Sequence, residues 1–383
     1  MPPVYLLIKP VSGQCNLRCR YCFYHDVLQK RGGELPPLQR EQRMHPETLE
    51  QVVAKGMSYA QGEITFAFQG GEPTLAGLDF YRRLIELEQR YNTRRLLVHN
   101  AIQTNGMVID REWAQFFAKN GFLVGLSLDG NKEANDRYRL DGGGKGSYHR
   151  ILQAAQLFDR YEVAYNILTV VTGQTARSIR RIYSFYQRSG FRYLQFIPCL
   201  DPLGEMRGQE DYSLTPRSYG DFLNALFDLW YPDMAAYLTG RGPRVSIRYF
   251  DNLLLMLLGN PPESCGMVGI CSRQNVVEAD GSVYPCDFYV LDRLRLGNLV
   301  TDSMEQIEER REALGFVAAS RAIPQRCAGC RWYPLCRGGC RRDRDEGDRL
   351  GDNYFCESFQ MFFFHAIQRL EELASLAQRV ERR

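Results

Sequence analysis

The sequence contains few histidines and tryptophans, little net charge and no long hydrophobic run. Its 383 residues include 5 histidines and 3 tryptophans, and 48 basic residues nearly balance 45 acidic ones, for a formal net charge of +3. The two signs are interleaved along the chain, so charge gives no argument for binding nucleic acid or an anionic membrane. There is also no internal repeat and no low-complexity stretch.

The hydrophobic runs that are present are too short to be targeting or membrane segments. Near the N-terminus, the run Val4–Ile8 is followed by Lys9 and Pro10, which is too short and wrongly flanked for a signal peptide. The run Phe362–Phe364 near the C-terminus is far too short to cross a bilayer. With 44% apolar and 24% charged residues, the composition is that of an ordinary globular protein. We therefore expect a cytoplasmic protein that binds no membrane.

Cysteine, by contrast, is plentiful, and eleven of the 12 cysteines fall into groups with the spacing of iron–sulfur ligands. The first group is the triplet Cys15, Cys19 and Cys22. A [4Fe–4S] cluster held by three thiolates has one iron without a protein ligand, and that iron can bind a small molecule. In a reducing cytoplasm, clustered cysteines indicate metal binding or catalysis more often than disulfides. A zinc site would normally need a fourth ligand, and only His25 follows closely, without finger-like spacing.

Eight further cysteines in the second half are enough for two four-thiolate sites. They are Cys265, Cys271, Cys286, Cys327, Cys330, Cys336, Cys340 and Cys356. Their spacing alone does not decide which four belong together, and the Cys327-x2-Cys330 pair suits a zinc ribbon equally well. Beside the first triplet, iron–sulfur clusters are the favoured interpretation, and two zinc ribbons are the alternative. The remaining cysteine, Cys199, is expected to be a small buried core residue.

Strand and helix patterns alternate over the first half of the chain, which predicts a parallel sheet built from βα units. Strands are predicted at Tyr5–Lys9, Ile64–Phe68, Leu96–Thr104, Phe122–Ser127, Ala164–Val171 and Tyr193–Ile197. Helices are predicted at Pro46–Gln61, Asp79–Tyr91, Asp110–Asn120, Ser147–Arg160 and Gln174–Arg188. The pattern fits either an open doubly wound sheet or a partial barrel, and both place active groups at the carboxyl ends of the strands.

The motifs of the first half all follow the ends of predicted strands. The cysteine triplet follows the first strand, Gln69–Pro73 follows the second, Gln103–Gly106 ends the third and Ser127–Gly130 ends the fourth. We therefore expect them to meet at one rim of the sheet. The two glycines of the second motif allow a backbone to approach a ligand closely, and Glu72 is expected to be free to meet an amino group.

The second half loses the regular alternation. A helical region is predicted at Ser218–Leu238, and a closing helix is predicted at Ser358–Arg379. We place the domain boundary close to the end of the first of these helices. This predicts one domain over residues 1–235 and a second, cysteine-rich domain over residues 236–383.

Together these motifs resemble known proteins. The triplet with its trailing aromatic residues, followed by GGEP, QTNG and LSLDG, resembles the radical S-adenosylmethionine superfamily, whose fold is a partial barrel. The later cysteines resemble its SPASM extension, which carries two auxiliary clusters. The closest resemblance is to the anaerobic sulfatase-maturating enzymes, through the runs Leu6–Pro10, Cys15–Cys19, Phe66–Glu72, Val245–Asp251 and Asp280–Asp287. It extends from Leu6 to Cys356 and implies an α/β fold, a partial (β/α)6 barrel with a C-terminal SPASM domain.

The resemblance also implies roles for individual residues. The cysteine triplet would hold the cluster that binds S-adenosylmethionine. The positions matched to contacts with this cofactor or its cluster are Tyr21, Gly71, Ser127, Arg139 and Leu200. The auxiliary ligands would be interleaved, with Cys265, Cys271, Cys286 and Cys340 on one cluster and Cys327, Cys330, Cys336 and Cys356 on the other. Asp287 matches the family's proposed catalytic base, although taken alone it would be interpreted as a turn or salt-bridge residue.

The activity that the resemblance implies is oxidation of one Cys or Ser of a sulfatase to Cα-formylglycine. Reductive cleavage of S-adenosylmethionine would produce a radical that removes a β-hydrogen from the target residue. Asp287 would then accept a proton, and an auxiliary cluster would accept the second electron. The implied cofactors are three [4Fe–4S] clusters and S-adenosylmethionine. The implied partners are an unfolded sulfatase polypeptide and a reduced flavodoxin or ferredoxin-like electron donor.

Two alternatives belong to other functional classes. One is a SPASM peptide maturase that forms thioether or carbon–carbon crosslinks in a small precursor peptide. Many such enzymes carry an N-terminal precursor-recognition domain, for which a barrel that starts within the first ten residues would leave no room. The other is a zinc-stabilised binding protein without chemistry, which would be colourless where an iron–sulfur protein is brown.

Overall fold

The computed structural model describes residues 3–32, 43–347 and 350–381. Contacts between residues divide the chain into two compact units, and neither unit is continuous in sequence. The first unit comprises Met1–Ser127, Asp136–Tyr165 and Arg273–Phe316. The second unit comprises Leu128–Asn135, Asn166–Ser272 and Val317–Arg383. The domain boundary expected after residue 235 stays a prediction.

Four parallel strands form the centre of the first unit. They are β1 (Val4–Ile8), β2 (Glu63–Phe68), β3 (Leu97–Thr104) and β4 (Leu123–Ser127). In register, Ile8 lies beside Phe68, and Phe68 lies beside Ile102. All three side chains are buried, as expected for parallel strands that are covered on both faces. The carboxyl ends of these strands therefore lie at one edge of the sheet.

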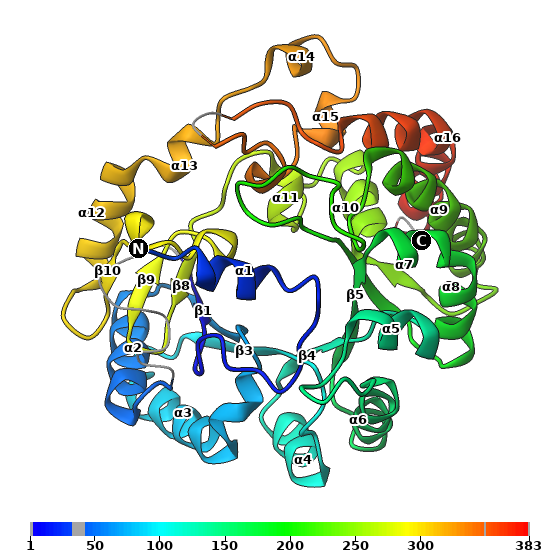
Figure 1. The fold of residues 1–383 in the computed structure, drawn as a ribbon. Coiled ribbons are helices and arrows are strands. Elements are labelled where there is room, and N and C mark those ends of the chain that lie inside the picture. The colour runs from blue at the N-terminus through cyan, green and yellow to red at the C-terminus, as the bar shows by residue number, and fades with distance from the viewer. Residues whose placement is uncertain (1–2, 33–42, 348–349, 382–383) are drawn as a thin grey trace. The chain divides into compact units, whose positions relative to one another are not determined.

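The first unit's helices cover the outer side of these strands, as Figure 1 shows, while α1 lies on the inner side. The covering helices are α2 (Pro46–Tyr59), α3 (Leu78–Tyr91), α4 (Arg111–Lys119) and α6 (Tyr148–Arg160), and the inner helix is α1 (Phe23–Gln29). The sequence explains several helix starts. Pro46 occupies the first position of α2, where its missing N–H is not needed, and Asp110 caps α4 by accepting a hydrogen bond from the Trp113 N–H (3.1 Å).

Three short strands from the second half of the sequence extend the sheet of the first unit. They are β8 (Asn275–Val277), β9 (Ser282–Tyr284) and β10 (Gly297–Asn298). Strand β8 pairs in parallel with β1, so that Val277 lies beside Ile8. Strands β9 and β10 then continue in antiparallel pairs, which gives the order β10-β9-β8-β1-β2-β3-β4 in this unit. Residues after Asn275 are thereby placed next to the first strand of the chain.

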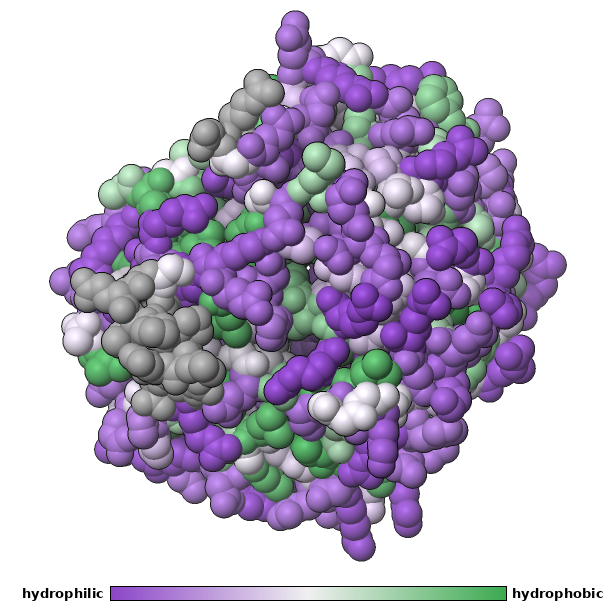
Figure 2. All heavy atoms as spheres, in the orientation of Figure 1, coloured by the Kyte–Doolittle hydropathy of each residue, from purple (hydrophilic) through white to green (hydrophobic). Residues whose placement is uncertain are grey.

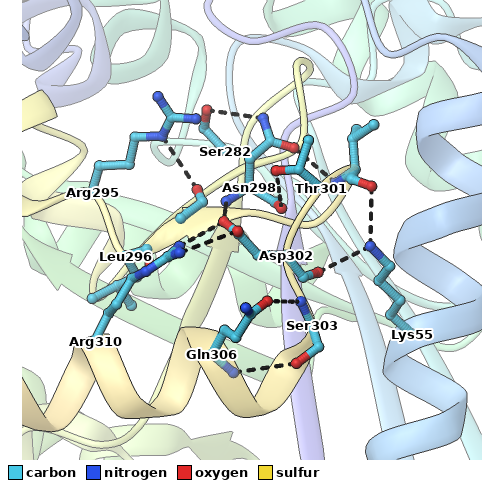
Figure 3. Close-up of polar contacts among 12 residues, drawn as sticks. Lys55, Ser282, Arg295, Leu296, Asn298, Thr301, Asp302, Ser303, Gln306 and Arg310 are labelled. Atoms are coloured by element: carbon cyan, nitrogen blue, oxygen red, sulfur yellow. Dashed lines mark hydrogen bonds and ion pairs between the residues drawn. The ribbon is translucent and has the colours of Figure 1, made fainter.

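Polar contacts fasten this added segment to helix α2 (Figure 3). The Lys55 ammonium of α2 donates to the carbonyl oxygens of Val300 (3.1 Å) and Asp302 (2.9 Å). The Asp302 carboxylate in turn pairs with Arg310 (2.6 Å) on helix α12 (Met304–Leu314). Helix α12 begins with a capping box formed by Ser303 and Gln306, so its start is fixed next to the same contacts.

The second unit has its own parallel strands and a set of packed helices. Its strands are β5 (Tyr165–Val171), β6 (Tyr193–Pro198) and β7 (Ser246–Ile247). Its longer helices are α8 (Ile179–Arg188), α9 (Pro216–Leu238), α10 (Arg248–Leu257) and α16 (Cys356–Glu381). The Phe362 ring of α16 packs edge-on against Phe227 of α9 and stacks on Phe250 of α10, at centroid distances of 5.8 and 5.6 Å.

The remaining helical elements are short. The α-helices among them are α5 (Lys132–Tyr138), α7 (Gly173–Arg177), α11 (Cys265–Val268), α13 (Phe316–Ala319), α14 (Gln325–Ala328) and α15 (Tyr333–Cys336). The 3-10 turns are η2 (Pro73–Ala76), η3 (Asp287–Tyr289), η4 (Asp292–Leu294) and η5 (Arg341–Asp343).

All six predicted strands are confirmed, with ends that differ by one residue at most. The prediction of one helix over Gln174–Arg188 is wrong, because the helix is interrupted at Ser178 and forms α7 and α8. The Thr172 hydroxyl caps α7 by accepting from the Thr175 N–H (3.1 Å), and a new helix starts after Ser178. A continuous helical pattern does not reveal such a break.

The surface carries mainly hydrophilic side chains on the face drawn in Figure 2, with hydrophobic residues in small groups. Over the residues that the structure describes, no helix combines the length and the apolar character needed to cross a bilayer.

Glu88 of α3 provides a test of the first unit's core. It is buried and receives one hydrogen bond, from the Asn100 amide (3.1 Å), and burial raises the pKa of its carboxyl group to about 7. The unfolded chain ionises this group near 4.5, so stability is lost as pH rises from about 4.5 through 7. We predict that Glu88→Gln increases the free energy of unfolding at pH 8 by up to about 3 kcal/mol and leaves it unchanged at pH 4.

Denaturant titrations at the two pH values measure this difference. Glu86→Gln is the matched control, since Glu86 is an exposed residue of the same helix that pairs with Arg83, and we expect a change below about 1 kcal/mol. An equal gain for Glu88→Gln at both pH values would contradict the assigned cause.

Candidate functional site

The three cysteines of the first group lie on one loop between β1 and α1. Cys22 is the residue immediately before the first turn of α1. The loop is held by backbone hydrogen bonds, in which Arg18 N–H donates to Leu140 O (2.7 Å) and Arg20 N–H donates to Tyr138 O (3.2 Å). The cysteine loop and residues 138–141 therefore form one local structure within the first unit.

Two of the predicted cofactor contacts meet at this loop. The Arg139 guanidinium lies over the Tyr21 ring, 5.6 Å from its centroid, and both side chains are buried. Tyr138 packs edge-on against the same ring at 6.1 Å. Arg139 is thus not the surface residue that an isolated arginine would suggest, because the tyrosine face stabilises its charge.

The glycine motif after β2 lies directly against the cysteine loop. The Gly71 N–H donates to Ser12 O (2.8 Å), and the Glu72 N–H donates to Gln14 O (2.7 Å). A Cβ atom on residue 71 would lie 2.0 Å from Gln14 O, which is shorter than any real contact. Only glycine allows this approach, so the motif fixes the backbone just before Cys15.

The expectation that Glu72 is free to bind a ligand's amino group is wrong. Its buried carboxylate accepts hydrogen bonds from the Thr74 N–H (3.1 Å) and hydroxyl (2.6 Å), the Thr104 hydroxyl (2.8 Å) and the Asn105 N–H (2.7 Å). Burial raises its pKa, and these hydrogen bonds oppose that effect. Glu72 therefore joins the motif after β2 to the motif after β3.

The chemistry of this loop, with three free thiols and hydrogen-bond donors near one sulfur, suits a cluster held by three thiolates. None of the cysteines is in a disulfide, and the Leu17 N–H and Asn105 amide point at the Cys15 sulfur (3.3 and 3.7 Å), as is usual around cluster sulfurs. Burial raises the pKa of the Cys15 thiol to about 11, so metal binding must displace its proton. Over the described ranges, no three His, Cys, Asp or Glu side chains are grouped as ligands of one metal ion.

Asp287 lies at the start of η3 and forms a buried ion pair. Its Oδ1 atom is 2.5 Å from the Nζ atom of Lys9, whose side chain is fully buried, and its Oδ2 atom accepts a hydrogen bond from the Gln69 amide (2.9 Å). Lys9 follows β1 and Gln69 follows β2, so both partners come from the carboxyl edge of the sheet. Removing one partner of such a pair costs about 3–5 kcal/mol, because an unpaired charge stays buried.

A second set of buried side chains surrounds Lys9. Its ammonium group lies 3.8 Å from the centroid of the Tyr24 ring, and the Tyr24 hydroxyl donates to Glu278. Glu278 also pairs with Arg31 (3.4 Å), which binds Asp292 (3.1 Å). Burial raises the pKa of Tyr24, so it remains a neutral phenol. The Lys9 ammonium thus contacts the Tyr24 ring and the Asp287 carboxylate.

Lys9 and Gln69 were not predicted from the sequence as site residues. Each is a polar residue directly after a buried strand; Lys9 precedes the cysteine triplet, and Gln69 is the first residue of the Gln69–Pro73 motif, although no role was predicted for its side chain. A polar residue directly after a buried strand was the sequence feature that could have identified them as site residues. Their pairing with Asp287 depends on β8 lying beside β1, which the sequence pattern does not reveal.

The second unit holds seven of the later cysteines, and Cys286 belongs to the first unit. Several of their sulfurs accept hydrogen bonds: Cys265 from the Ser272 hydroxyl (3.3 Å), Cys340 from the Arg342 N–H (3.4 Å) and Cys356 from the Gln360 amide (3.5 Å). Burial raises the pKa of Cys336 to about 12. The assignment of these cysteines to two clusters stays a prediction.

Three further predicted residues have simple locations. Ser127 is buried at the carboxyl end of β4 in the first unit, as its motif predicts. Leu200 lies in the second unit, in the segment after β6. Cys199 is buried, which confirms the prediction that it is a core residue.

Gly71 allows a test of the contact between the two loops. We predict that Gly71→Ala lowers the free energy of unfolding by about 1–3 kcal/mol, because the new methyl group collides with the Gln14 carbonyl and a rigid backbone must move. Gly142→Ala is the control, since a Cβ atom there meets no atom within 4 Å, and we expect no loss. Chemical unfolding of the three proteins measures the effect, and equal stabilities would contradict the close approach.

Comparisons with known proteins identify the family of the chain. Residues 10–186 match the model of the radical SAM superfamily, and residues 265–331 match a model described as an iron–sulfur cluster-binding domain, SPASM. The second match disfavours zinc ribbons for the later cysteines. The predicted fold class, a partial (β/α)6 barrel with a C-terminal SPASM domain, is confirmed.

Relatives align over nearly the whole chain. The cysteine-type anaerobic sulfatase-maturating enzyme of Clostridium novyi (strain NT) is 48% identical over 376 residues, which cover 98% of each chain. The serine-type enzyme of Bacteroides thetaiotaomicron is 30% identical, over 95% of this chain and 89% of its own. A solved structure described as native anSMEcpe with bound AdoMet and Cp18Cys peptide is 46% identical, with a TM-score of 0.91 over 98% of this chain and 99% of that one. The chain therefore belongs to the anaerobic sulfatase-maturating enzymes of the radical SAM superfamily.

Proposed function

We propose that this protein oxidises one residue of an unfolded sulfatase polypeptide to Cα-formylglycine, and that its preferred target is cysteine. The relatives named cysteine-type are 47–48% identical to this chain, and those named serine-type are 30% identical. The observation that carries the proposal is the buried Lys9–Asp287 pair in the same unit as the cysteine triplet. It supplies a carboxylate where the resemblance requires a base.

The cofactors are three [4Fe–4S] clusters and S-adenosylmethionine. Cys15, Cys19 and Cys22 hold the cluster that binds S-adenosylmethionine. The residues proposed to contact this cofactor or its cluster are Tyr21, Gly71, Ser127, Arg139 and Leu200. When bound, this cofactor supplies the radical chemistry that removes one hydrogen atom from the β-carbon of the target residue. Cys265, Cys271, Cys286 and Cys340 hold one auxiliary cluster, and Cys327, Cys330, Cys336 and Cys356 hold the other.

Asp287 is the proposed general base. A thiol that becomes a thioaldehyde loses one hydrogen atom from carbon, one proton from sulfur and one further electron, which an auxiliary cluster would accept. Hydrolysis of the thioaldehyde then gives the aldehyde and releases hydrogen sulfide. The Asp287 carboxylate takes that proton, which requires it to be ionised before the reaction. The Lys9 ammonium lies 2.5 Å from Oδ1 and holds the carboxylate in position. Gln69 donates to Oδ2 and fixes the plane of the carboxylate.

We further propose a cytoplasmic protein that binds neither nucleic acid nor membrane and receives electrons from a reduced flavodoxin or ferredoxin-like protein. The near balance of basic and acidic residues and the lack of a membrane-crossing helix among the described residues support this. The two-domain division at residue 235 is part of the same proposal, since helix α9 ends at Leu238.

The test is mass spectrometry of a sulfatase-derived peptide, in Cys and Ser versions, after anaerobic incubation with reconstituted enzyme, S-adenosylmethionine and dithionite. We predict an aldehyde at the target residue, formed faster from Cys. Asp287→Asn is expected to slow its formation about 10²–10⁴-fold, the usual contribution of a general base. Asp221→Asn on the exposed face of α9 makes the same chemical change and is expected to leave the rate unchanged.

Two results would contradict this function. If S-adenosylmethionine is cleaved but the peptide is unchanged, the protein performs radical chemistry on another class of peptide, such as precursor peptides that become crosslinked. An aldehyde formed at the full rate by Asp287→Asn would remove Asp287 from the mechanism.

A further inference from the structure

The second unit contains a long segment with basic residues and no acidic ones. Residues 317–342 include no Asp or Glu and six arginines, in a chain whose total charge is only +3. The arginines are Arg321, Arg326, Arg331, Arg337, Arg341 and Arg342. A concentration of one sign in an otherwise balanced chain creates a local positive potential.

Part of this segment lines a surface cavity of about 300 Å³. All of its lining residues belong to the second unit, and none is acidic. Its branched apolar and arginine side chains are those of Val268, Ile270, Arg321, Ile323, Arg337 and Arg344. We call the cavity lined by this set the basic groove.

The basic groove combines exposed apolar side chains with fixed positive charge. Ile323 is 56% exposed, Ile270 is 40% exposed and Val268 is 37% exposed. Apolar residues grouped with arginine are typical of protein interfaces, whereas isolated exposed apolar residues are common on any protein surface. The groove therefore has the composition of a docking surface for a protein that carries negative charge.

Two of the arginines that line the groove, Arg344 and Arg321, differ in exposure. The Arg344 side chain is buried, and two of its nitrogens donate to Ala322 O (3.0 Å) and Ser320 O (2.8 Å). Its Nε atom is buried without a hydrogen-bond acceptor among the described residues. Arg321, which also lines the groove, is exposed, and the part of the chain that the structure describes offers it no ion-pair partner. The Arg321 charge is thus available to groups from outside the chain.

The groove adjoins redox-active cysteines along the sequence. Ile270 precedes Cys271, and Arg337 follows Cys336. The match to an iron–sulfur cluster-binding domain covers residues 265–331, which include much of the lining. A protein docked here would approach the part of the chain that the match assigns to clusters.

We propose that the basic groove docks an acidic one-electron carrier protein of the flavodoxin type. The inference rests on the proposed function, since a redox enzyme needs such a carrier. Charge complementarity identifies the partner as acidic, and the exposed Ile and Val side chains identify it as a protein with an apolar contact patch. A nucleic acid would require a more strongly charged and less apolar surface.

Binding of oxidised flavodoxin to the reconstituted enzyme tests the proposal without using catalysis. We expect Arg321→Glu to weaken binding roughly tenfold at low ionic strength, with a smaller effect at high salt, because an attraction becomes a repulsion. We expect Ile323→Ala to weaken it roughly threefold with an unchanged salt dependence. Arg180→Glu makes the same charge change at an exposed site on α8 of the same unit, and we expect less than roughly a twofold effect.

Three results would overturn the docking site. One is equal weakening by Arg180→Glu and Arg321→Glu, which would indicate a general charge effect. Another is unchanged binding in both Arg321→Glu and Ile323→Ala. The third is displacement of flavodoxin by a short RNA whose own binding Arg321→Glu also weakens, which would indicate a nucleic-acid surface.

Peptide oxidation driven by dithionite separates this inference from the proposed function, because the chemical reductant needs no docking site. If the enzyme converts the peptide and Arg321→Glu binds flavodoxin as well as the unmodified enzyme, the docking site is ruled out and the proposed function stands. If flavodoxin binding follows the prediction but the peptide stays unchanged, the docking site stands and the proposed substrate is ruled out.

Discussion

The buried ion pair between Lys9 and Asp287 is the constraint on which the arrangement of the first unit depends. A fully buried ammonium group needs a nearby negative charge, because an uncompensated charge in the interior costs several kcal/mol. The partner comes from a segment almost three hundred residues later in the sequence. The pairing of β8 with β1 brings the two residues together, so the sheet register and the ion pair support each other.

The same edge of the sheet collects the other functional groups, and each is held by contacts that need a particular residue type. Gly71 approaches the Gln14 carbonyl too closely for any side chain, and Glu72 accepts four hydrogen bonds from the loops after β2 and β3. Arg139 packs on the face of Tyr21. Radical chemistry requires reacting groups at fixed positions, and a network of this kind provides such positions before any substrate binds.

Much of this arrangement could be predicted from the sequence. Buried parallel strands give short, nearly continuous apolar runs, which is why all six were found within one residue. Glycine, cysteine and asparagine motifs at their ends indicated the correct edge. The resemblance to a family supplied Asp287, which composition and spacing alone would have assigned to a turn.

The missed features depend on contacts between distant segments. Strands β8 to β10 have only two or three residues each, and they exist because β1 offers a free edge. Lys9 and Gln69 acquire their importance from the same pairing. Glu72 was expected to bind a ligand because the sequence does not show that Thr104 and Asn105 reach its carboxylate. The grouping of the later cysteines is not encoded in their spacing, since Cys336 and Cys340 are close neighbours in sequence.

A double-mutant cycle on the ion pair tests the central claim most directly. The rate of peptide oxidation would be measured for the unmodified enzyme, Lys9→Met, Asp287→Asn and the combination of both. If Lys9 acts by holding the Asp287 carboxylate in position, the double variant is no slower than Asp287→Asn alone, which gives a coupling of roughly 1–3 kcal/mol. If the two effects on the rate simply multiply, Lys9 and Asp287 act independently, and a role for Lys9 in positioning Asp287 is contradicted.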